Sequence, residues 1–368
     1  MNWTNIKRQA RYAATFLRHR GIRATARYGW FYLAYCTDLI RENRVLAWLI
    51  NNEDYPRMIE VETTTACNLR CTMCEHTYWN YPARNMSFEQ FKHIVDQFPR
   101  LYWIGMTGIG SSFLNKDFPR MVEYVHRRGV IVDMFDHFND LTDEQIEWLV
   151  RVGVERMWAS VDACTKEVYE QIRVGGNFDK VTANLRKLIA TKARFRSPFP
   201  QLSFQFIITR QNLHQVPEFV DFVQAVTDGD NFGIRFSPLI CDFAEIKDMD
   251  ARLERDYMRE AERRATKYGM LLVWNKVHRE GMLPMRYCTE WTQPFFLVDG
   301  SVVPCCATNE HNAREYQIKT ALGNIFQQSF KEIWDGPKYR ALRETLKAGG
   351  VPPPCVQCPV YARPEKTC

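Results

Sequence analysis

Met58-Ile59-Glu60-Val61-Glu62-Thr63 is followed, two residues later, by Ala66-Cys67-Asn68-Leu69-Arg70-Cys71-Thr72-Met73-Cys74. The first stretch has the pattern of a β-strand, and the second places three cysteines in one short loop. Three thiolates on one loop make a metal site, because soft sulfur ligands select zinc, copper(I) or iron–sulfur clusters. No fourth cysteine lies nearby in the sequence. A four-iron cluster on this loop would therefore keep one iron open to a substrate or cofactor.

Short apolar, β-branched runs alternate with longer helical patterns from residue 58 onward. Six such strand-plus-helix units predict an α/β fold with a parallel sheet, either open and doubly wound or curved into a partial (βα)6 barrel. Both architectures place active sites at the C-terminal ends of the strands, where the cysteine loop falls. The predicted strands lie near residues 58–65, 101–107, 130–136, 154–162, 202–209 and 232–240, and the predicted helices near 87–98, 117–128, 143–152, 177–193, 214–227 and 250–269.

Changes in pattern divide the chain into three regions. Residues 1–57 form a helical extension and residues 58–280 the barrel. Residues 281–368 form a small module with clustered cysteines, glycines and prolines, as in Gly300-Ser301-Val302-Val303-Pro304-Cys305-Cys306. Such a short, punctuated segment is typical of a module held together by metal.

The N-terminal region carries the net charge of +6. Residues 1–58 hold ten Lys or Arg against four acids, and Trp3, Ile6, Ala10, Ala13 and Leu17 follow helical spacing. A basic amphipathic helix can lie on an anionic membrane surface, so peripheral contact at the inner membrane surface is one interpretation. The other, which we favour, is a helical layer packed on the catalytic domain. Nucleic-acid binding is disfavoured, because the rest of the chain adds no basic patch.

The clustering of the cysteines indicates the cellular compartment of the protein. The chain has twelve cysteines but no signal peptide, so clustered cysteines indicate metal ligands rather than disulfides. The apolar stretch from Tyr28 to Thr37 has ten residues and is too short to span a bilayer. These features predict a cytoplasmic protein.

The C-x3-C-x2-C spacing of Cys67, Cys71 and Cys74 resembles that of the radical SAM superfamily. The resemblance implies a [4Fe-4S] cluster whose open iron binds S-adenosylmethionine, with Met73 beside it, and an electron-delivering reductase such as flavodoxin or ferredoxin. The segment around Gly108 and Gly110 stands in place of the family's Gly-Gly-Glu turn, with Ser111 in place of the glutamate. Because the Ser111 hydroxyl carries no charge, binding of the methionine amino group would rest more on backbone carbonyls or be weaker.

Other segments extend the resemblance over roughly residues 56 to 240. Ser160-Val161-Asp162 and Ile172-Arg173-Val174-Gly175 look like the family's Ser-x-Asp and Ile-Arg-x-Gly segments, which implies that Ser160, Asp162 and Arg173 line the cofactor. Asn212 also resembles a recurring family position. Each has a structural alternative: an N-cap for Asp162, a surface ion pair for Arg173 and turn chemistry for Asn212.

The C-terminal module resembles the SPASM/twitch extensions of the same superfamily. Its ligands by that resemblance are Cys288, Cys305, Cys355 and Cys358, which match the single-cluster twitch form and imply a second, auxiliary [4Fe-4S] cluster. Cys306 competes with Cys305 for one coordination position of the cluster, and Cys368 is a weaker candidate ligand. A structural zinc held by the same thiolates is the alternative, because all-cysteine zinc sites share these spacings.

The resemblance implies that a 5′-deoxyadenosyl radical removes hydrogen from a substrate, with oxidation or epimerisation as outcomes. Two residues are candidates for direct catalytic roles. Glu62 is costly on a barrel-lining strand unless it is paired, for instance with Arg235, or functional, and Cys241 could return a hydrogen atom. The expected substrate is a small molecule, such as a sugar, cyclitol or lipid-linked intermediate. The alternatives are a maturase of ribosomally made peptides and a zinc-stabilised binding protein on a decayed fold.

Overall fold

A ten-stranded sheet organises the molecule. The computed structural model describes residues 3–35, 45, 54–239, 251–274, 288, 290–306, 314–348 and 350–355. The strands follow the order β12-β11-β10-β1-β3-β4-β5-β7-β8-β9 across the sheet. Their bounds are β1 Met58–Val61, β3 Trp103–Met106, β4 Ile131–Asp136, β5 Arg156–Ser160, β7 Gln201–Ile208, β8 Gly233–Pro238, β9 Leu272–Trp274, β10 Phe295–Phe296, β11 Ser301–Val303 and β12 Gly323–Asn324.

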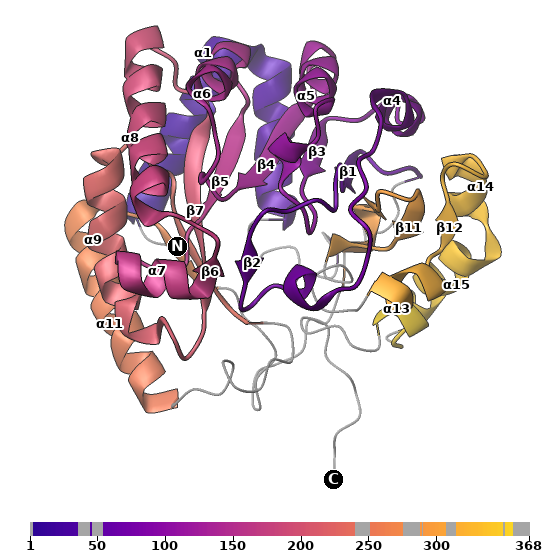
Figure 1. The fold of residues 1–368 in the computed structure, drawn as a ribbon. Coiled ribbons are helices and arrows are strands. Elements are labelled where there is room, and N and C mark those ends of the chain that lie inside the picture. The colour runs from indigo at the N-terminus through magenta and orange to yellow at the C-terminus, as the bar shows by residue number, and fades with distance from the viewer. Residues whose placement is uncertain are drawn as a thin grey trace.

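The six predicted strands are β1, β3, β4, β5, β7 and β8, and each pairs in parallel with the next. Helices connect them and lie in an arc around the sheet (Figure 1). The predicted parallel α/β architecture is thus confirmed, and β9 extends it by pairing in parallel with β8. The connecting helices are α4 Phe88–Asp96, α5 Phe118–Arg127, α6 Asp143–Val152, α7 Lys166–Ile172, α8 Phe178–Phe195, α9 Val216–Thr227 and α11 Ala251–Tyr268.

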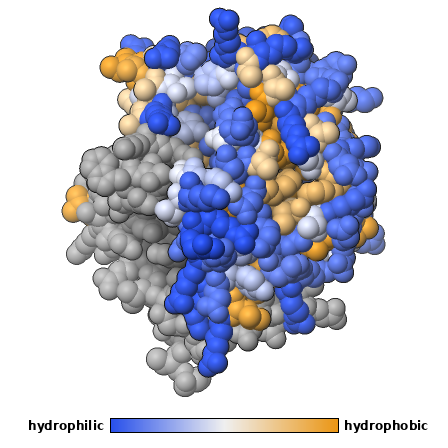
Figure 2. Space-filling model, turned by 90° about the vertical axis from the view of Figure 1, so that its left-hand side faces the viewer, coloured by the Kyte–Doolittle hydropathy of each residue, from blue (hydrophilic) through white to orange (hydrophobic). Residues whose placement is uncertain are grey.

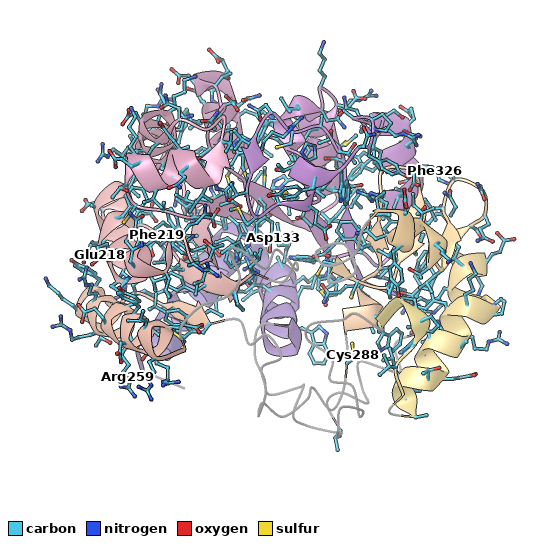
Figure 3. The ribbon with its side chains drawn as sticks, turned by 60° about the horizontal axis from the view of Figure 1, so that its bottom comes forward. Asp133, Glu218, Phe219, Arg259, Cys288 and Phe326 are labelled. Atoms are coloured by element: carbon cyan, nitrogen blue, oxygen red, sulfur yellow. The ribbon has the colours of Figure 1, made fainter. Side chains whose placement is uncertain are left out.

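The two faces of the sheet differ in polarity, because side chains alternate along each strand. Ile59, Val61, Val132 and Met134 belong to the main hydrophobic core, which also contains the inward faces of the connecting helices. The alternate positions carry polar and charged side chains, including Glu60, Asp133, Arg156 and Arg235. The apolar face therefore packs on the helices, and the polar face lines the inside of the curve. Figure 3 shows Asp133 near the centre of the molecule.

Helix α1 (Trp3–Tyr35) covers the N-terminal ends of the strands. It is interrupted at Gly21, whose φ of 77° is a left-handed value that suits glycine, and its two halves stack Phe16 on Tyr28 with ring centroids 4.4 Å apart. Both rings pack against the first residues of neighbouring strands, Met58 and Trp103 among them. The favoured interpretation of a helical layer on the barrel fits this packing. The predicted apolar stripe does not fit this packing. Its member Leu17 is 52% exposed, and Phe16 makes the contact with the strands instead.

The C-terminal region continues the same sheet. Strand β10 pairs in parallel with β1, and β11 and β12 follow as antiparallel strands. Three helices complete this region beside the sheet, α13 Arg314–Lys319, α14 Phe330–Asp335 and α15 Pro337–Lys347 (Figure 1). Phe330 contacts Phe98 at a centroid distance of 4.7 Å, so the region shares the barrel's core.

The surface over α8, α9 and α11 faces the viewer in Figure 2 and is mainly hydrophilic, with one apolar strip. Ion pairs cover part of it: Arg264 contacts Glu218, Asp221 and Glu260. None of the helices in the described ranges is both long and apolar enough to cross a membrane.

Candidate functional site

The cysteine loop lies at the C-terminal end of β1 and is held by a second, two-stranded sheet. Strand β2 (Arg70–Cys71) pairs antiparallel with β6 (Arg173–Val174), so Cys71 lies opposite Arg173. The amide of Thr72 extends the pairing by donating to the carbonyl of Ile172 at 2.9 Å. A 3-10 turn, η1 Glu75–Tyr78, ends the loop. The sheet thereby fixes the loop to a segment a hundred residues later.

The three thiols of the loop lie together. Cys71 is buried with Leu69, Met73, Ile172 and Leu239, and Cys67 and Cys74 pack against this cluster. Burial raises the pKa of Cys71 to about 11 and that of Cys74 to about 12. The neighbouring thiols contribute to both rises, because like charges oppose one another at short range. Bound iron would replace these protons, since metals take the thiolate form.

This arrangement fits a cluster whose irons bind one thiolate each. No disulfide joins Cys67, Cys71 or Cys74. In the part of the chain that the structure describes, no three His, Cys, Asp or Glu side chains are arranged to hold a single metal ion. In a four-iron cluster each cysteine binds a different iron, so its ligands stand farther apart than those of one ion.

Arg173 connects the thiols to Asp162. Its Nε donates to Asp162 Oδ2 at 2.7 Å, and its Nη1 lies 4.0 Å from the Cys71 sulfur. Asp162 is fully buried, and its other oxygen accepts the Ile207 amide at 2.7 Å. The structural alternatives are wrong for both residues, because Asp162 caps no helix and the ion pair of Arg173 is buried. A cation beside Cys71 favours its thiolate.

Asn212 binds the backbone around Asp162. Its Nδ2 donates to the carbonyls of Asp162 and Ile207, at 2.8 Å each, and its Oδ1 accepts the Thr209 amide at 2.7 Å. The side chain is fully buried. Asn212 therefore performs the turn chemistry considered as its alternative, and it does so at the ends of β5 and β7 where Ser160 and Asp162 lie.

The glycine turn packs directly on the cysteine loop. Ser111 donates its amide to the Ala66 carbonyl at 2.7 Å and is itself buried. A Cβ on Gly110 would lie 2.4 Å from the Thr64 carbonyl oxygen, and one on Gly108 would lie 2.6 Å from Cγ of Glu62. A Cβ at either position would overlap these atoms, so the close packing of the turn on the loop requires glycine.

Glu62 joins the glycine turn to the C-terminal region. It is fully buried and accepts the Arg314 Nη2 at 2.6 Å, the Val298 amide at 3.1 Å and the Ile109 amide at 3.4 Å. Burial raises the pKa of Glu62, and Arg314 acts in the opposite direction. The suggested pairing with Arg235 is wrong, since the partner is Arg314 at the start of α13.

The C-terminal cysteines lie in separate elements. Cys288 packs against the main core, and it is labelled in Figure 3 beside the C-terminal helices. Cys306 packs on Phe295, Leu297 and Val303. Burial raises the pKa of the Tyr339 phenol, and Cys305 lies close enough to Tyr339 to contribute to that rise. Cys355 ends a short 3-10 turn. Cys241, Cys358 and Cys368 lie outside the described residues.

Sequence reasoning missed two contributors to this end of the sheet, Arg314 and Trp158. Arg314 is 4% exposed and lies over the Trp79 ring at 4.9 Å, just after the cysteine loop. Trp158 stacks against Phe135 on the polar face of the sheet, with centroids 5.6 Å apart. Alternation along β5, where Arg156, Trp158 and Ser160 share a face, was the signal that could have found Trp158.

Two family models match separate parts of the chain. A model of the radical SAM superfamily matches residues 61–223, and a model of the SPASM iron–sulfur cluster-binding domain matches residues 288–359. The first range contains Cys67, Cys71 and Cys74, and the second contains Cys288, Cys305, Cys355 and Cys358.

Two curated relatives match different lengths of the chain. The tungsten-containing aldehyde ferredoxin oxidoreductase cofactor-modifying protein of Pyrococcus furiosus is 24% identical over 335 residues, which cover 82% of this chain and 87% of that protein. The mycofactocin maturase MftC of Mycobacterium tuberculosis is 29% identical over 168 residues, which cover 45% of this chain and 41% of MftC. The match to MftC thus spans less than half of either protein.

Solved structures share the fold. SuiB of Streptococcus suis bound to S-adenosylmethionine superposes with a TM-score of 0.63 at 14% identity, covering 92% of this chain and 84% of SuiB. SuiB bound to its precursor peptide SuiA superposes with a TM-score of 0.62. These matches place a radical SAM domain at residues 61–223 and a SPASM domain at residues 288–359, and the two domains imply a [4Fe-4S] cluster, S-adenosylmethionine and auxiliary iron–sulfur clusters.

Proposed function

We propose that Cys67, Cys71 and Cys74 hold the [4Fe-4S] cluster and that the enzyme removes a hydrogen atom from a small, cofactor-like molecule. When bound, the cluster and S-adenosylmethionine supply the 5′-deoxyadenosyl radical for that step. The observation that carries the proposal is the cluster of three thiols at the C-terminal end of β1, of which Cys71 is buried and Cys67 and Cys74 are half-buried, with Arg173 beside Cys71. Charge complementarity supports it, because a guanidinium stabilises an assembly of thiolates.

The surrounding residues bind and orient S-adenosylmethionine in this proposal. Gly108, Gly110 and Ser111 offer backbone groups and a hydroxyl to its amino end, and Met73 packs beside the loop. Ser160 is half-buried at the end of β5 and lines the nucleoside side. Asp162, Arg173 and Asn212 hold that edge in shape through their mutual contacts. Glu62 acts as a positioning residue, since Arg314 and the Val298 amide engage both of its oxygens.

The SPASM region supplies a second site in the proposal. Cys288, Cys305, Cys355 and Cys358 are the proposed ligands of one auxiliary [4Fe-4S] cluster, which would accept an electron from the substrate and give an oxidation. Parallel pairing of β10 with β1 supports this placement, because it brings the region beside the strand that precedes the cysteine loop. A reductase such as flavodoxin or ferredoxin is the proposed electron donor.

Two observations favour a small molecule over a peptide. A relative that matches most of both chains is named for modifying a cofactor. In addition, the described part of residues 1–57 contains helix α1 at the opposite end of the barrel from the cysteine loop, where it would not guide a peptide to the site. Neither relative reported above acts, by its name, on a sugar or cyclitol. Peptide maturation is the second candidate, favoured by the likeness to MftC and SuiB.

We also propose a cytoplasmic enzyme that touches the inner membrane surface through α1. The helix contains no acidic residue, and Arg11, Arg18, Arg23 and Arg27 are exposed on it beside Ile22, which is 75% exposed. Arginines attract anionic lipids, and apolar side chains enter the interface. Sedimentation with anionic vesicles but not with zwitterionic ones is expected, and Arg18→Glu with Arg23→Glu should abolish it. Equal sedimentation with both vesicle types would contradict this contact.

Reductive cleavage of S-adenosylmethionine tests the proposed function. Reconstituted protein with dithionite should form 5′-deoxyadenosine, and Cys71→Ala should reduce it to background. Cys164→Ala is the matched control, because Cys164 is a half-buried thiol in the loop after β5 and outside the cysteine cluster. Zinc without labile sulfide, or product formation that survives Cys71→Ala, would overturn the proposal.

A further inference from the structure

An open hollow lies between helices α1, α8 and α9 at the N-terminal end of the barrel. Its volume is about 670 Å³, which is within the usual range for small-molecule sites. Its lining includes side chains from residues 189–198 and 227–230, where α8 and α9 end and the chain leads into β7 and β8. The hollow therefore lies at the opposite end of the strands from the cysteine loop.

Two helix faces form the walls of the hollow. Arg11, Ala14, Thr15 and Arg18 line it from α1, whereas Ile189, Lys192 and Ala193 line it from α8 and Arg196 from the C-cap of that helix. Residues three and four positions apart share one face of a helix, so each set faces the hollow together. Ala14 and Ala193 are exposed, although both lie on these facing surfaces. The two helices therefore leave space between them at this level.

The hollow carries an excess of positive charge. Four Lys or Arg and two Asp line it. Lys192 is 2% exposed and pairs with Asp230 at 2.9 Å, so its charge is matched. The other three are Arg11, Arg18 and Arg196, and within the described ranges none of them has a carboxylate at ion-pair distance. Three guanidinium groups thus face one remaining aspartate.

The three arginines are placed to act on one ligand. Arg11 and Arg18 are seven residues apart, which is roughly 10 Å along the axis of α1, so their long side chains reach a group between them. Arg196 approaches from the opposite wall, and all three are exposed. The C-terminal end of α8 would repel an anion, but Lys192 and Arg194 in its last turn offset that dipole.

We infer that this hollow binds a phosphomonoester, that is, a phosphate group attached to a small polar molecule such as glycerol. Such a phosphate carries nearly two negative charges and three acceptor oxygens, which match guanidinium groups that approach from two sides. Ile189 and Pro198 offer apolar contact to the attached group. Because the hollow is remote from Cys71, the bound phosphate is not the reacting group, and the inference goes beyond the proposed radical chemistry.

Glycerol 3-phosphate and glycerate are matched soluble probes, because they share a three-carbon skeleton and differ in the anionic group. Calorimetric titration of the full chain should show saturable binding of glycerol 3-phosphate, and binding of glycerate at least about tenfold weaker. Arg18→Gln and Arg196→Gln should each raise the Kd of glycerol 3-phosphate about tenfold. Ala193→Glu should abolish binding, since it adds a carboxylate at an exposed position of the hollow.

Vesicles identify the source of the phosphate, which is either a soluble molecule or a lipid headgroup. Leu17 and Ile22 on α1 are 52% and 75% exposed, and apolar side chains of this kind enter a lipid interface. We therefore expect stronger sedimentation with phosphatidic acid vesicles than with phosphatidylglycerol vesicles of equal surface charge, and Arg196→Gln should remove the difference. Equal sedimentation, with binding of glycerol 3-phosphate retained, would assign the site to a soluble phosphomonoester.

Control variants separate this inference from the proposed function. Arg186→Gln removes a charge from an exposed position of α8 outside the hollow and should leave the Kd of glycerol 3-phosphate unchanged. Cys71→Ala should also leave it unchanged, so loss of radical chemistry and loss of phosphate binding are separate results. Absence of saturable binding, equal affinity for the two soluble probes, or a Kd that Arg18→Gln, Arg196→Gln and Ala193→Glu all leave unchanged would overturn the inference.

Discussion

The two proposed sulfur sites of this molecule draw their cysteines from the chain in different ways. Cys67, Cys71 and Cys74 come from one loop of eight residues, and the β2–β6 pairing fixes that loop beside Arg173. The C-terminal cysteines come from elements spread from Cys288 to Cys358, and those described lie half-buried. A site from one loop can keep an iron open, whereas a site from several elements joins those elements together. We therefore assign chemistry to the first site and electron acceptance to the second.

The largest expected effect comes from removing the first site. Replacing Cys67, Cys71 or Cys74 with alanine should abolish 5′-deoxyadenosine formation and remove about four irons per chain, because a three-ligand cluster cannot spare a ligand. Iron and sulfide analysis with product chromatography measures both effects. Cys164→Ala should keep the full iron content and activity. Full activity in any of the three loop variants would contradict the assignment of the chemistry to the first site.

Removing ligands of the second site should stop substrate turnover but leave the cleavage of S-adenosylmethionine. Cys288→Ala with Cys355→Ala should lower iron by about four per chain and stop substrate turnover, while S-adenosylmethionine cleavage persists. The same pair of assays measures this split, with substrate consumption added.

Cys305 and Cys306 give the sharpest test of that second site, since they are adjacent. Cys305→Ala should lose the auxiliary iron, whereas Cys306→Ala should retain it, because Cys306 packs among Phe295, Leu297 and Val303. The reverse result would assign the ligand to Cys306.

Glu62 connects the two regions, and its loss should destabilise the folded protein. Glu62→Ala leaves the Arg314 charge buried without its carboxylate, which typically costs about 3–5 kcal/mol in unfolding free energy. Glu62→Gln should cost less, because it retains a hydrogen-bond acceptor. Denaturant unfolding of the metal-free protein gives the stability, and hydrogen exchange at the Ile109 and Val298 amides gives the local effect. Unchanged exchange at both amides would argue against the connection.

Arg173 should affect the first site alone, and by the smallest amount. A cation 4.0 Å from the Cys71 sulfur stabilises the more negative, reduced cluster. Arg173→Gln should therefore lower the reduction potential of the first cluster, on the order of 50 mV for a partly screened charge, and leave the auxiliary cluster unchanged. Arg173→Lys should retain most of the potential. Redox titration followed by EPR separates the two clusters, and an equal shift in both would contradict a local effect.

The sequence predicted the parts of this molecule that depend on short-range patterns. Alternation and helical spacing predicted the six strands and the connecting helices other than α7, and the C-x3-C-x2-C loop predicted the thiol cluster.

Long-range partners could not be predicted in this way. The Arg173–Cys71 contact and the Glu62–Arg314 pair join residues that are 102 and 252 positions apart. Charge and spacing permit many such pairs, and only the strand register selects one. The same reason explains why Arg235 was assigned to Glu62, although it lies over Trp158.

EPR of a variant that lacks the auxiliary ligands tests the central claim most directly. In Cys288→Ala with Cys305→Ala and Cys355→Ala, only the cluster of Cys67, Cys71 and Cys74 remains. Adding S-adenosylmethionine to the reduced variant should change the g-values of its signal, because the cofactor binds the open iron. A reduced spectrum identical with and without S-adenosylmethionine would contradict the account.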